Sequence, residues 1–438
     1  MEHSYLQATK ELLQYIQDSP TAFHAVESAT KILESNGFSR LQDSDAWNLE
    51  PGKGYYVTRN QSAIIAFRLP KSTPNNFMIT ASHTDSPMFK LKNNYEQAAC
   101  NKYIRLNTEV YGGTILSSWL DRPLSLAGRV ILCQNGTFLV KNVKIDRDLI
   151  LIPNVAIHLN RSVNNGYVYN PAVDLMPLFS ESGDGKKDVK DLLSDELGCK
   201  KDEIVGMDLY VVCRTPGTVW GANEEFFSAP RIDNLMCAFS TLKGLCGATN
   251  HNSVCVYYAA DNEETGSATK QGAGSVFLSD VLDRICEGLH TDKRRMLASS
   301  MMVSADNGHA KHPNHPELSD ANNAPSLGGG VVIKSNAAQK YATDGVSAAL
   351  FTEICRRADI PVQFYANRSD MPGGSTLGSI SNTRVPLITV DIGMAQLAMH
   401  SAYETASVAD TEHLIRASKA FYESHLTSDG DGNYTLHE

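Results

Sequence analysis

The segment of residues 76–87 reads NFMITASHTDSP, and it gives the strongest indication of the fold. Residues 76–82 are almost continuously apolar, which is typical of a strand buried on both faces of a sheet. His83 follows this strand directly and would lie at its C-terminal end. Open α/β sheets place their functional sites along this edge. The segment therefore predicts an α/β protein with a site that begins at His83.

Four other short segments carry residue types that bind hard or borderline metal ions. They are residues 231–234 (RIDN), 261–264 (DNEE), 304–306 (SAD) and 399–401 (MHS). Predicted strands at 254–260, 301–304 and 386–391 precede three of them, so the ligands are expected at the C-terminal edge of one sheet. Only a folded chain can bring such distant segments together. The pattern predicts one metal centre rather than a local His/Asp-rich patch.

Together, the five segments supply ligands for two metal ions. A pair of divalent ions about 3.5–4 Å apart can activate a water molecule and polarise a carbonyl group. Such a pair needs a short carboxylate that bridges it, and we predict Asp233 for this role. His83 and Asp306 would complete the shell of one ion, and Glu264 and His400 the shell of the other.

Two further acidic residues are predicted to be catalytic. Asp85 lies two residues after His83 and is placed to accept a hydrogen bond from the ring nitrogen that faces away from the metal. Glu263 precedes a predicted ligand. A carboxylate beside a metal-bound water is suited to act as general base, and later as the acid for the leaving amine.

Each of these residues, taken alone, also fits an ordinary structural role. His83 could be a hydrogen-bonding residue at a strand end, and Asp233 could cap a helix. Glu263 and Glu264 could form the exposed start of a helix. The occurrence of all five segments at predicted strand ends favours the metal centre.

Composition narrows the range of partners. The chain has 438 residues, 20% of them charged, and a formal net charge of -10, which is typical of a soluble globular protein and disfavours nucleic-acid binding. No stretch reaches the roughly 20 apolar residues of a membrane span. Residues 1–4 show no basic region followed by an apolar one, so no signal peptide is expected. The nine cysteines are scattered without a CxxC pair, which predicts a reducing, cytoplasmic location.

Strand and helix patterns divide the chain into two domains. Apolar spacing predicts a helix at 5–17. A second predicted helix begins with Ser19 as N-cap and Pro20 in its first turn, and it ends near residue 36. After residue 93 the pattern changes to short strands (103–110, 129–132, 137–140 and 149–153), with an exposed excursion at 180–203. Helices at 235–246 and 411–425 follow once the α/β pattern resumes. We predict a catalytic domain of residues 1–93 and 225–438, interrupted by an inserted β-rich domain of residues 94–224.

Further candidates lie near the predicted metal ligands. Residues 306–315 read DNGHAKHPNH, which favours a substrate-facing loop over a surface metal-binding tract. Lys334 follows an apolar stretch and a glycine turn, with a surface lysine at a strand end as the alternative. Asp370 opens a Gly/Pro turn, residues 370–376, that could form a pocket wall or be simply a turn.

Ordered motifs along the whole chain carry a family resemblance. They are residues 19–26 (SPTAFHAV), 83–87 (HTDSP), 119–130 (WLDRPLSLAGRV), 156–161 (AIHLNR), 231–235 (RIDNL), 261–267 (DNEETGS), 304–306 (SAD), 312–314 (HPN), 341–344 (YATD) and 399–401 (MHS). In these motifs, from near the first helix to the last, the chain resembles the aspartyl aminopeptidase family of zinc exopeptidases. The resemblance implies a mixed-sheet catalytic domain and a metalloaminopeptidase that acts on peptides.

The resemblance implies the same roles for the ligands, Glu263 and Asp85, with two Zn²⁺ per subunit and Mn²⁺ or Co²⁺ as alternatives at one site. It also implies that the inserted domain serves dimerisation and that dimers assemble into a dodecamer. His158 would reach into a neighbouring subunit's active site. Lys334 would pair with an acidic first residue of the substrate, Asp or Glu. Other substrate-binding candidates are His312, Tyr341 and Asp370.

The chain departs from the family pattern at two places. Gly373 stands where a cysteine is common, and Asn307-Gly308 replaces a more usual Met-Ala. Both lie near the expected pocket and bear on substrate preference more than on catalysis. Three alternatives stay open: an aminopeptidase that prefers neutral residues, a related amidohydrolase or carboxypeptidase, and a non-catalytic assembly protein that kept the fold.

Overall fold

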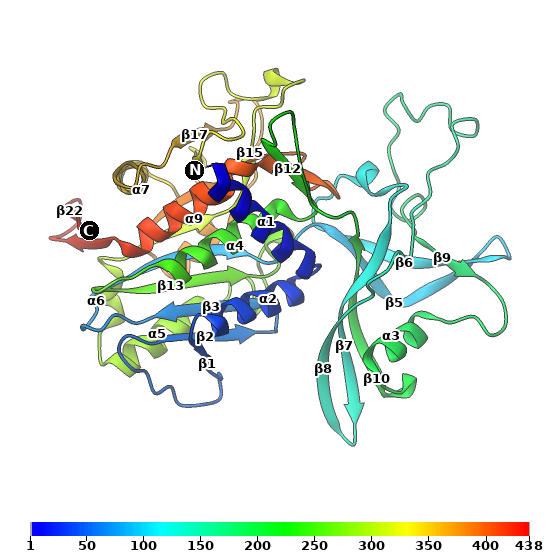
Figure 1. The fold of residues 1–438 in the computed structure, drawn as a ribbon, viewed down its shortest axis with the longest axis horizontal. Helices are drawn as coiled ribbons and strands as arrows, with labels where there is room; N and C mark the ends of the chain where they lie inside the picture. Colours follow the sequence, from blue (N-terminus) through cyan, green and yellow to red (C-terminus); the bar gives the residue numbers. More distant parts are fainter. Residues whose placement is uncertain (1, 438) are drawn as a thin grey trace.

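A nine-stranded mixed sheet forms the centre of the protein (Figure 1). The structure, a computed structural model, describes residues 2–437. The strand order is β1-β2-β3-β13-β4-β14-β18-β16-β17. The strands are β1 (Phe38–Arg40), β2 (Gly54–Arg59), β3 (Ala63–Arg68), β4 (Asn76–His83), β13 (Ser253–Ala260), β14 (Met301–Ala305), β16 (Val331–Ser335), β17 (Val362–Ala366) and β18 (Ile388–Gly393).

The four central strands, β13, β4, β14 and β18, run parallel to one another. Every residue of β4 and of β13 is buried, as expected for strands covered on both faces. The predicted α/β class and the predicted strand at 76–82 are confirmed. His83 is the last residue of β4.

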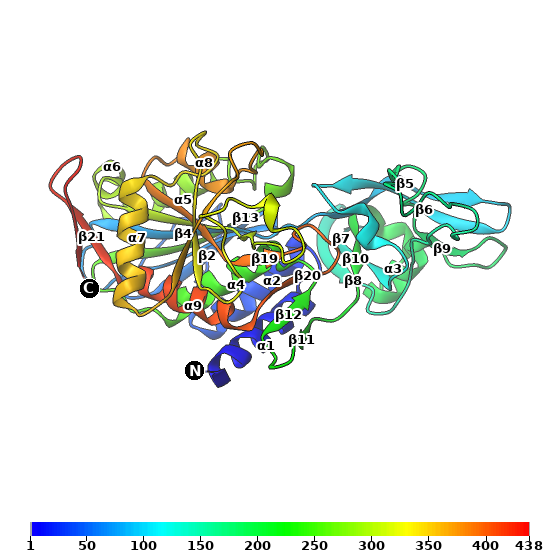
Figure 2. The same cartoon turned by 90° about the horizontal axis from the view of Figure 1, so that it is seen from above.

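Helices cover both faces of this sheet, as Figure 2 shows. One face carries α1 (Glu2–Asp18), α2 (Ala22–Ser35), α4 (Ile232–Gly247), α7 (Gly345–Arg357) and α9 (Val408–Glu423). The other carries α5 (Phe277–Leu289), α6 (Lys293–Leu297) and α8 (Leu377–Asn382). The predicted helices near both ends are confirmed, but the closing helix ends at residue 423. A hairpin follows it, formed by β21 (His425–Ser428) and β22 (Tyr434–His437).

The start of α2 differs from the prediction. Its N-cap is Thr21, not Ser19. The buried guanidinium of Arg231 donates hydrogen bonds to the carbonyl groups of Ile16 (3.0 Å) and Ser19 (3.1 Å). These contacts hold Ser19 in the turn that ends α1, so the next helix begins two residues later.

A six-stranded antiparallel sheet forms a lobe that projects from one side of the molecule (Figures 1 and 2). Its strands are β5 (Met88–Ala99), β6 (Tyr103–Tyr111), β7 (Leu124–Gln134), β8 (Thr137–Lys144), β9 (Leu178–Glu181) and β10 (Ile204–Cys213). The lobe has its own apolar core. The predicted boundary after residue 93 falls within β5, and the domain limits stay a prediction.

The expected exposed excursion at 180–203 is confirmed for residues 181–187, which are all exposed, but the rest of the segment is partly packed. It contains α3 (Val189–Leu197), which buries Val189 and Leu193 in the core of the lobe. Asp188 and Asp191 form a capping box at the start of this helix. The charged residues that suggested exposure, Asp184, Lys186 and Lys187, lie in the exposed loop before this helix. The predicted strand at 149–153 forms only isolated bridges to neighbouring segments.

A smaller five-stranded sheet lies between the lobe and the large sheet. Its strands are β11 (Thr218–Trp220), β12 (Phe226–Ala229), β15 (Gly308–His309), β19 (Ala395–Leu397) and β20 (Glu404–Ser407). This sheet brings residues near 230 and near 400 side by side, because β12 pairs with β20. Among the described residues, no helix is long and apolar enough to cross a membrane.

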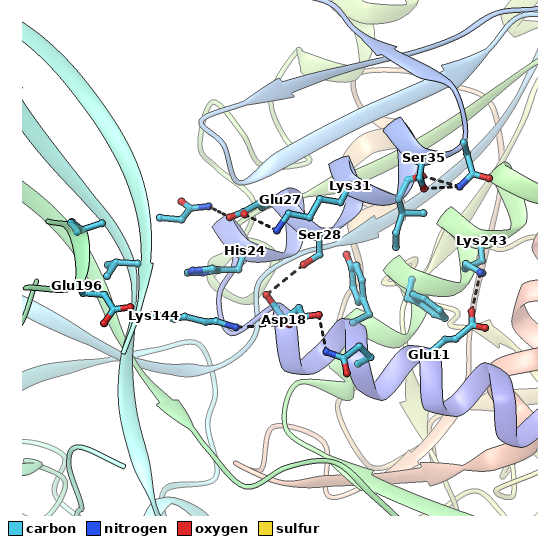
Figure 3. Close-up of a pocket in the computed structure, with 18 residues that line it drawn as sticks. Glu11, Asp18, His24, Glu27, Ser28, Lys31, Ser35, Lys144, Glu196 and Lys243 are labelled. Carbon is cyan, nitrogen blue, oxygen red and sulfur yellow. Dashed lines mark hydrogen bonds and ion pairs between the residues drawn. The ribbon is translucent and has the colours of Figure 1, made fainter. Parts of the chain in front are cut away.

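A cavity of about 700 Å³ lies where α1 and α2 face the lobe (Figure 3). It is lined by the buried His24 of α2 and by Lys144 of β8, among others. The His24 side chain extends toward the lobe, and its Nδ1 lies 2.9 Å from the hydroxyl of Thr21. Burial lowers the pKa of His24 to about 4; the charge of Glu27 opposes this shift, and the charges of Lys144 and Arg231 add to it.

His24 should make the fold less stable in mild acid. The unfolded chain binds a proton at this histidine below about pH 6.5, whereas the folded chain binds it only below about pH 4. Lowering the pH through this window therefore favours unfolding. We expect His24→Gln to lose less stability than the unaltered chain from about pH 7 to about pH 5, by about 2 kcal/mol. Denaturant unfolding of both proteins in a chelator measures this, and parallel pH profiles would contradict it.

Candidate metal centre

Three of the predicted metal ligands lie side by side at one edge of the large sheet. His83 ends β4, Asp306 follows β14, and Glu264 lies in the short helix η3 (Glu263–Thr265) after β13. These strands are parallel neighbours, and Ala260 at the end of β13 pairs with His83. Their C-terminal ends therefore meet, as the sequence predicted for these segments.

The other two predicted ligands reach this edge from elsewhere. Asp233 lies in the first turn of α4, just after β12. His400 lies in the turn between β19 and β20. The expectation that every ligand follows a strand of one sheet is therefore wrong for these two. The pairing of β12 with β20 in the smaller sheet brings them together instead.

Asp233 lies between the two histidines. Its Oδ1 is 3.5 Å from Nε2 of His83, and its Oδ2 is 3.6 Å from Nε2 of His400. The same nitrogen of His83 is 3.8 Å from Oδ1 of Asp306, and that of His400 is 3.3 Å from Oε2 of Glu264. The five side chains thus form two groups that share Asp233.

The donor set and its burial fit a divalent cation. Ligand atoms of His83, Asp233 and Glu264 all lie within 4.8 Å of one another. Oδ1 of Asp233 and Oε1 of Glu264 are buried and accept no hydrogen bond. A buried carboxylate oxygen without a donor or a cation is costly. Histidine nitrogens and carboxylate oxygens are also the ligands that zinc takes.

Asp85 contacts His83 and the segment that carries Glu263. Nδ1 of His83 lies 3.1 Å from the carbonyl oxygen of Asp85 and 3.4 Å from its Oδ1. The Asp85 carboxylate accepts hydrogen bonds from the backbone N–H groups of Glu263 (3.1 Å) and Glu264 (3.2 Å). Asp85 therefore connects the orientation of a predicted ligand with the position of the predicted general base.

Burial and like charges shift the titration of the centre. Burial raises the pKa of Glu263 to about 8; the charge of His83 opposes this shift, and that of Asp306 adds to it. Burial lowers the pKa of His400, but its contact with Asp233 and the charge of Glu264 outweigh burial and raise it to about 10. A bound cation would favour the deprotonated ligands, so metal affinity should rise with pH.

Sequence reasoning missed two contacts that the lobe makes with the centre. Tyr111, at the end of β6, donates a hydrogen bond to Oδ2 of Asp85 (2.7 Å). Two residues on, the carbonyl oxygen of Gly113 lies 3.0 Å from Nδ1 of His400. Gly112 between them has φ +73, and a Cβ there would lie 3.1 Å from Cβ of Glu264. The adjacent glycines were visible in the sequence, but nothing local indicated what they approach.

A buried glutamate, Glu404, was missed as well. Its two carboxylate oxygens accept hydrogen bonds from the backbone N–H groups of Asp233 (2.9 Å) and His400 (2.8 Å). Burial raises its pKa to about 8, and the charge of Asp233 adds to the shift. The only sequence signal is a glutamate four residues after a predicted ligand, which is too common to be informative.

Two of the predicted substrate-binding residues lie beside the centre. Lys334 is buried in β16, and its Nζ donates to the carbonyl oxygens of Asp306 (2.7 Å) and Asn307 (3.3 Å). The alternative of a surface lysine is therefore wrong. Tyr341 is also buried, with its ring centroid 5.1 Å from the Lys334 ammonium.

The other three lie apart from the ligands within one chain. His158 is exposed in a loop of the lobe, and Asp370 is exposed and paired with Arg368 at 2.7 Å. Nδ1 of His312 accepts a hydrogen bond from the backbone N–H of Asn314 (3.2 Å). Throughout residues 2–437, no side-chain hydrogen bond or ion pair connects these three residues to the five predicted ligands.

The chain belongs to the M18 family. Residues 15–422 match the family described as Aminopeptidase I zinc metalloprotease (M18). A protein of Clostridium novyi named "Probable M18 family aminopeptidase 2" is 43% identical over 423 residues, which cover 94% of this chain and 98% of that protein. The protein is accordingly an aminopeptidase hydrolase of a zinc metalloprotease family.

Solved structures of the same family share the fold. The cryo-EM structure of the Ape4 and Nbr1 complex contains a chain with a TM-score of 0.92 and 34% identity, covering 95% of this chain and 86% of that one. The mApe1 dodecamer of S. cerevisiae has a TM-score of 0.84 and 26% identity, covering 96% of this chain and 97% of that one.

Divalent cations should stabilise the fold through Asp233. Adding excess zinc to chelator-treated protein is expected to raise the melting temperature, because a ligand at about 100 times its Kd contributes about 2.7 kcal/mol. Asp233→Ala, which removes the carboxylate common to both groups, should abolish most of this rise. Differential scanning fluorimetry with and without zinc measures both. A full zinc-induced rise in the variant would exclude Asp233 from the site.

Proposed function

We propose that the protein is a two-zinc aminopeptidase that removes an N-terminal Asp or Glu from peptides. The observation that carries the two-metal proposal is the position of Asp233, with one carboxylate oxygen toward each of two histidines. A site for a single metal ion would not need a carboxylate that is shared with a second group of ligands, here His400 and Glu264. Mn²⁺ or Co²⁺ is the alternative at one position.

The roles of the ligands follow from their grouping. His83 and Asp306 would hold one ion, Glu264 and His400 the other, and Asp233 both. When bound, the two ions supply Lewis-acid chemistry: they polarise the scissile carbonyl and lower the pKa of water. Asp85 acts behind them by fixing the ring of His83, as carboxylates beside metal-binding histidines do.

Glu263 is the proposed general base. It removes a proton from the attacking water molecule and delivers it to the amine that leaves. Its backbone N–H donates to Asp85, so the carboxylate that orients His83 also holds the base in place. Its partial burial limits competing contact with bulk water.

The preference for an acidic first residue rests on Lys334. Two backbone carbonyl groups accept hydrogen bonds from its ammonium, which leaves one of its three N–H groups for a further acceptor. A substrate carboxylate is such an acceptor. The ion pair of Lys334 with Asp306, at 3.9 Å, keeps this cation at the edge of the centre.

Assembly into a homo-oligomer is part of the proposal. A relative of this fold is described as a dodecamer. In the lobe, the loop around His158 exposes apolar side chains, including Leu159 (84% exposed) and Val168 (86%). This loop would meet a neighbouring subunit and bring His158 to its site, and mass photometry would report the assembly. The nine unpaired cysteines support a reducing, cytoplasmic location.

Glu263→Gln should abolish turnover and leave metal binding intact. The amide cannot accept the proton, yet it keeps the size of the side chain and the backbone contact with Asp85. We expect kcat to fall by roughly 10²- to 10⁴-fold, with zinc content by atomic absorption unchanged. A variant that retains most of its activity would remove Glu263 from the mechanism.

A peptide panel tests the function as a whole. Zinc-loaded protein and a chelated control are given short peptides that begin with Asp, Glu, Leu, Lys or N-acetyl-Asp, and initial rates are compared. Metal-dependent cleavage of the Asp and Glu peptides alone is expected. Cleavage of the Leu peptide would favour a neutral preference, and cleavage of the acetylated peptide a related amidohydrolase or carboxypeptidase. No cleavage at all would favour the non-catalytic alternative.

A further inference from the structure

Glu404, behind the metal centre, holds the backbone of two proposed ligands. Only 1% of the residue is exposed. Its Oε2 accepts a hydrogen bond from the backbone N–H of Asp233, and its Oε1 accepts one from the backbone N–H of His400. Both oxygens are therefore engaged by donors on the protein side of the centre. Glu404 contacts the ligands through their backbone and is not itself placed as a ligand.

These two hydrogen bonds reinforce the pairing of β12 with β20, which brings Asp233 and His400 together. Asp233 and His400 belong to segments far apart in the sequence, and neither ends a strand of the large sheet. His400 also adopts a left-handed backbone conformation, with φ +67, which is uncommon for a residue other than glycine. A buried carboxylate that accepts its N–H offsets this cost and holds the turn in place.

A series of buried hydrogen bonds from Asn307 and Gln396 supports Glu404. Nε2 of Gln396 donates to Oε1 of Glu404 (3.2 Å), and Nδ2 of Asn307 donates to Oε1 of Gln396 (2.7 Å). Asn307 follows Asp306 directly in the sequence, and its own Oδ1 accepts from the backbone N–H of Met394 (3.2 Å). These hydrogen bonds thus connect Asn307, which is next to the proposed ligand Asp306, with the backbone of the proposed ligands Asp233 and His400.

We propose that Glu404 is a positioning residue for the metal centre, and that Asn307 and Gln396 set its orientation. The inference rests on the proposed metal site and adds a buried carboxylate whose two hydrogen bonds fix Asp233 relative to His400. It also gives the Asn307 departure from the family pattern a role in metal binding. A Met side chain at that position could not donate the hydrogen bond to Gln396.

Glu404→Gln tests the proposal with little change in volume. The substitution turns one carboxylate oxygen into an NH₂ group, which cannot accept a hydrogen bond from a backbone N–H. Either Asp233 or His400 therefore loses its backbone hydrogen bond to residue 404. We expect zinc affinity, measured by competition with a chelating dye, to fall roughly 10- to 100-fold. The visible absorption spectrum of the Co²⁺-loaded protein should change too, because it reports ligand geometry.

Asp410→Asn is the matched control. Asp410 is also a fully buried carboxylate that accepts two backbone hydrogen bonds, from Gly328 (2.8 Å) and Gly330 (3.2 Å). It belongs to α9 and contacts none of the proposed ligands through the hydrogen bonds or ion pairs described for residues 2–437. This variant should lose stability but keep the zinc affinity and Co²⁺ spectrum of the unaltered chain.

The outcomes separate this inference from the proposed function. If the unaltered chain binds zinc and Glu404→Gln binds it equally with the same Co²⁺ spectrum, the positioning role is overturned. If the unaltered chain binds none, the proposed function fails and the inference fails with it. Should Glu404→Gln not fold, Gln396→Met decides: a loss of affinity of about threefold or more supports the proposal, and a smaller loss overturns it.

Discussion

The repulsion among buried carboxylates is the constraint on which the rest of this structure depends. Asp233, Glu264 and Asp306 lie close together in a region from which water is largely excluded. Like charges at such distances strongly oppose folding unless a cation or a proton neutralises them. The chain therefore needs rigid elements that hold these side chains against their repulsion, and a cation that offsets it.

Rigidity comes from the elements that carry the ligands. β4 and β13 are buried along their whole length, and their parallel pairing fixes the spacing between His83 and the start of η3. Backbone N–H groups that point at Asp85 and Glu404 supply the next layer of support. These two carboxylates contact different members of the ligand set: Asp85 contacts His83 and Glu264, and Glu404 contacts Asp233 and His400.

The sequence predicts the part of this site that depends on local pattern. The apolar residues before His83 indicate a buried strand, and His83 marks the end of that strand at which a site is expected. The segment before Asp306 is interpreted in the same way. Asp233 and His400 were recognised by residue type and motif, but their placement depends on the pairing of β12 with β20. Nothing in either short strand specifies that partner. Glu404 and Tyr111 act through contacts between distant segments, so no local pattern marks them.

The end of β6 has a consequence for modularity. Tyr111 and Gly113 lie at and just after the end of β6, between two strands of the lobe, yet they touch Asp85 and His400. Excision of the lobe would remove the hydrogen-bond donor of Asp85, which is Tyr111, and the hydrogen-bond acceptor of His400, which is the carbonyl group of Gly113. The larger sheet is thus not an autonomous unit with an accessory attached. Recombination or redesign that exchanges the lobe has to preserve this short segment, whatever happens to the other strands of the lobe.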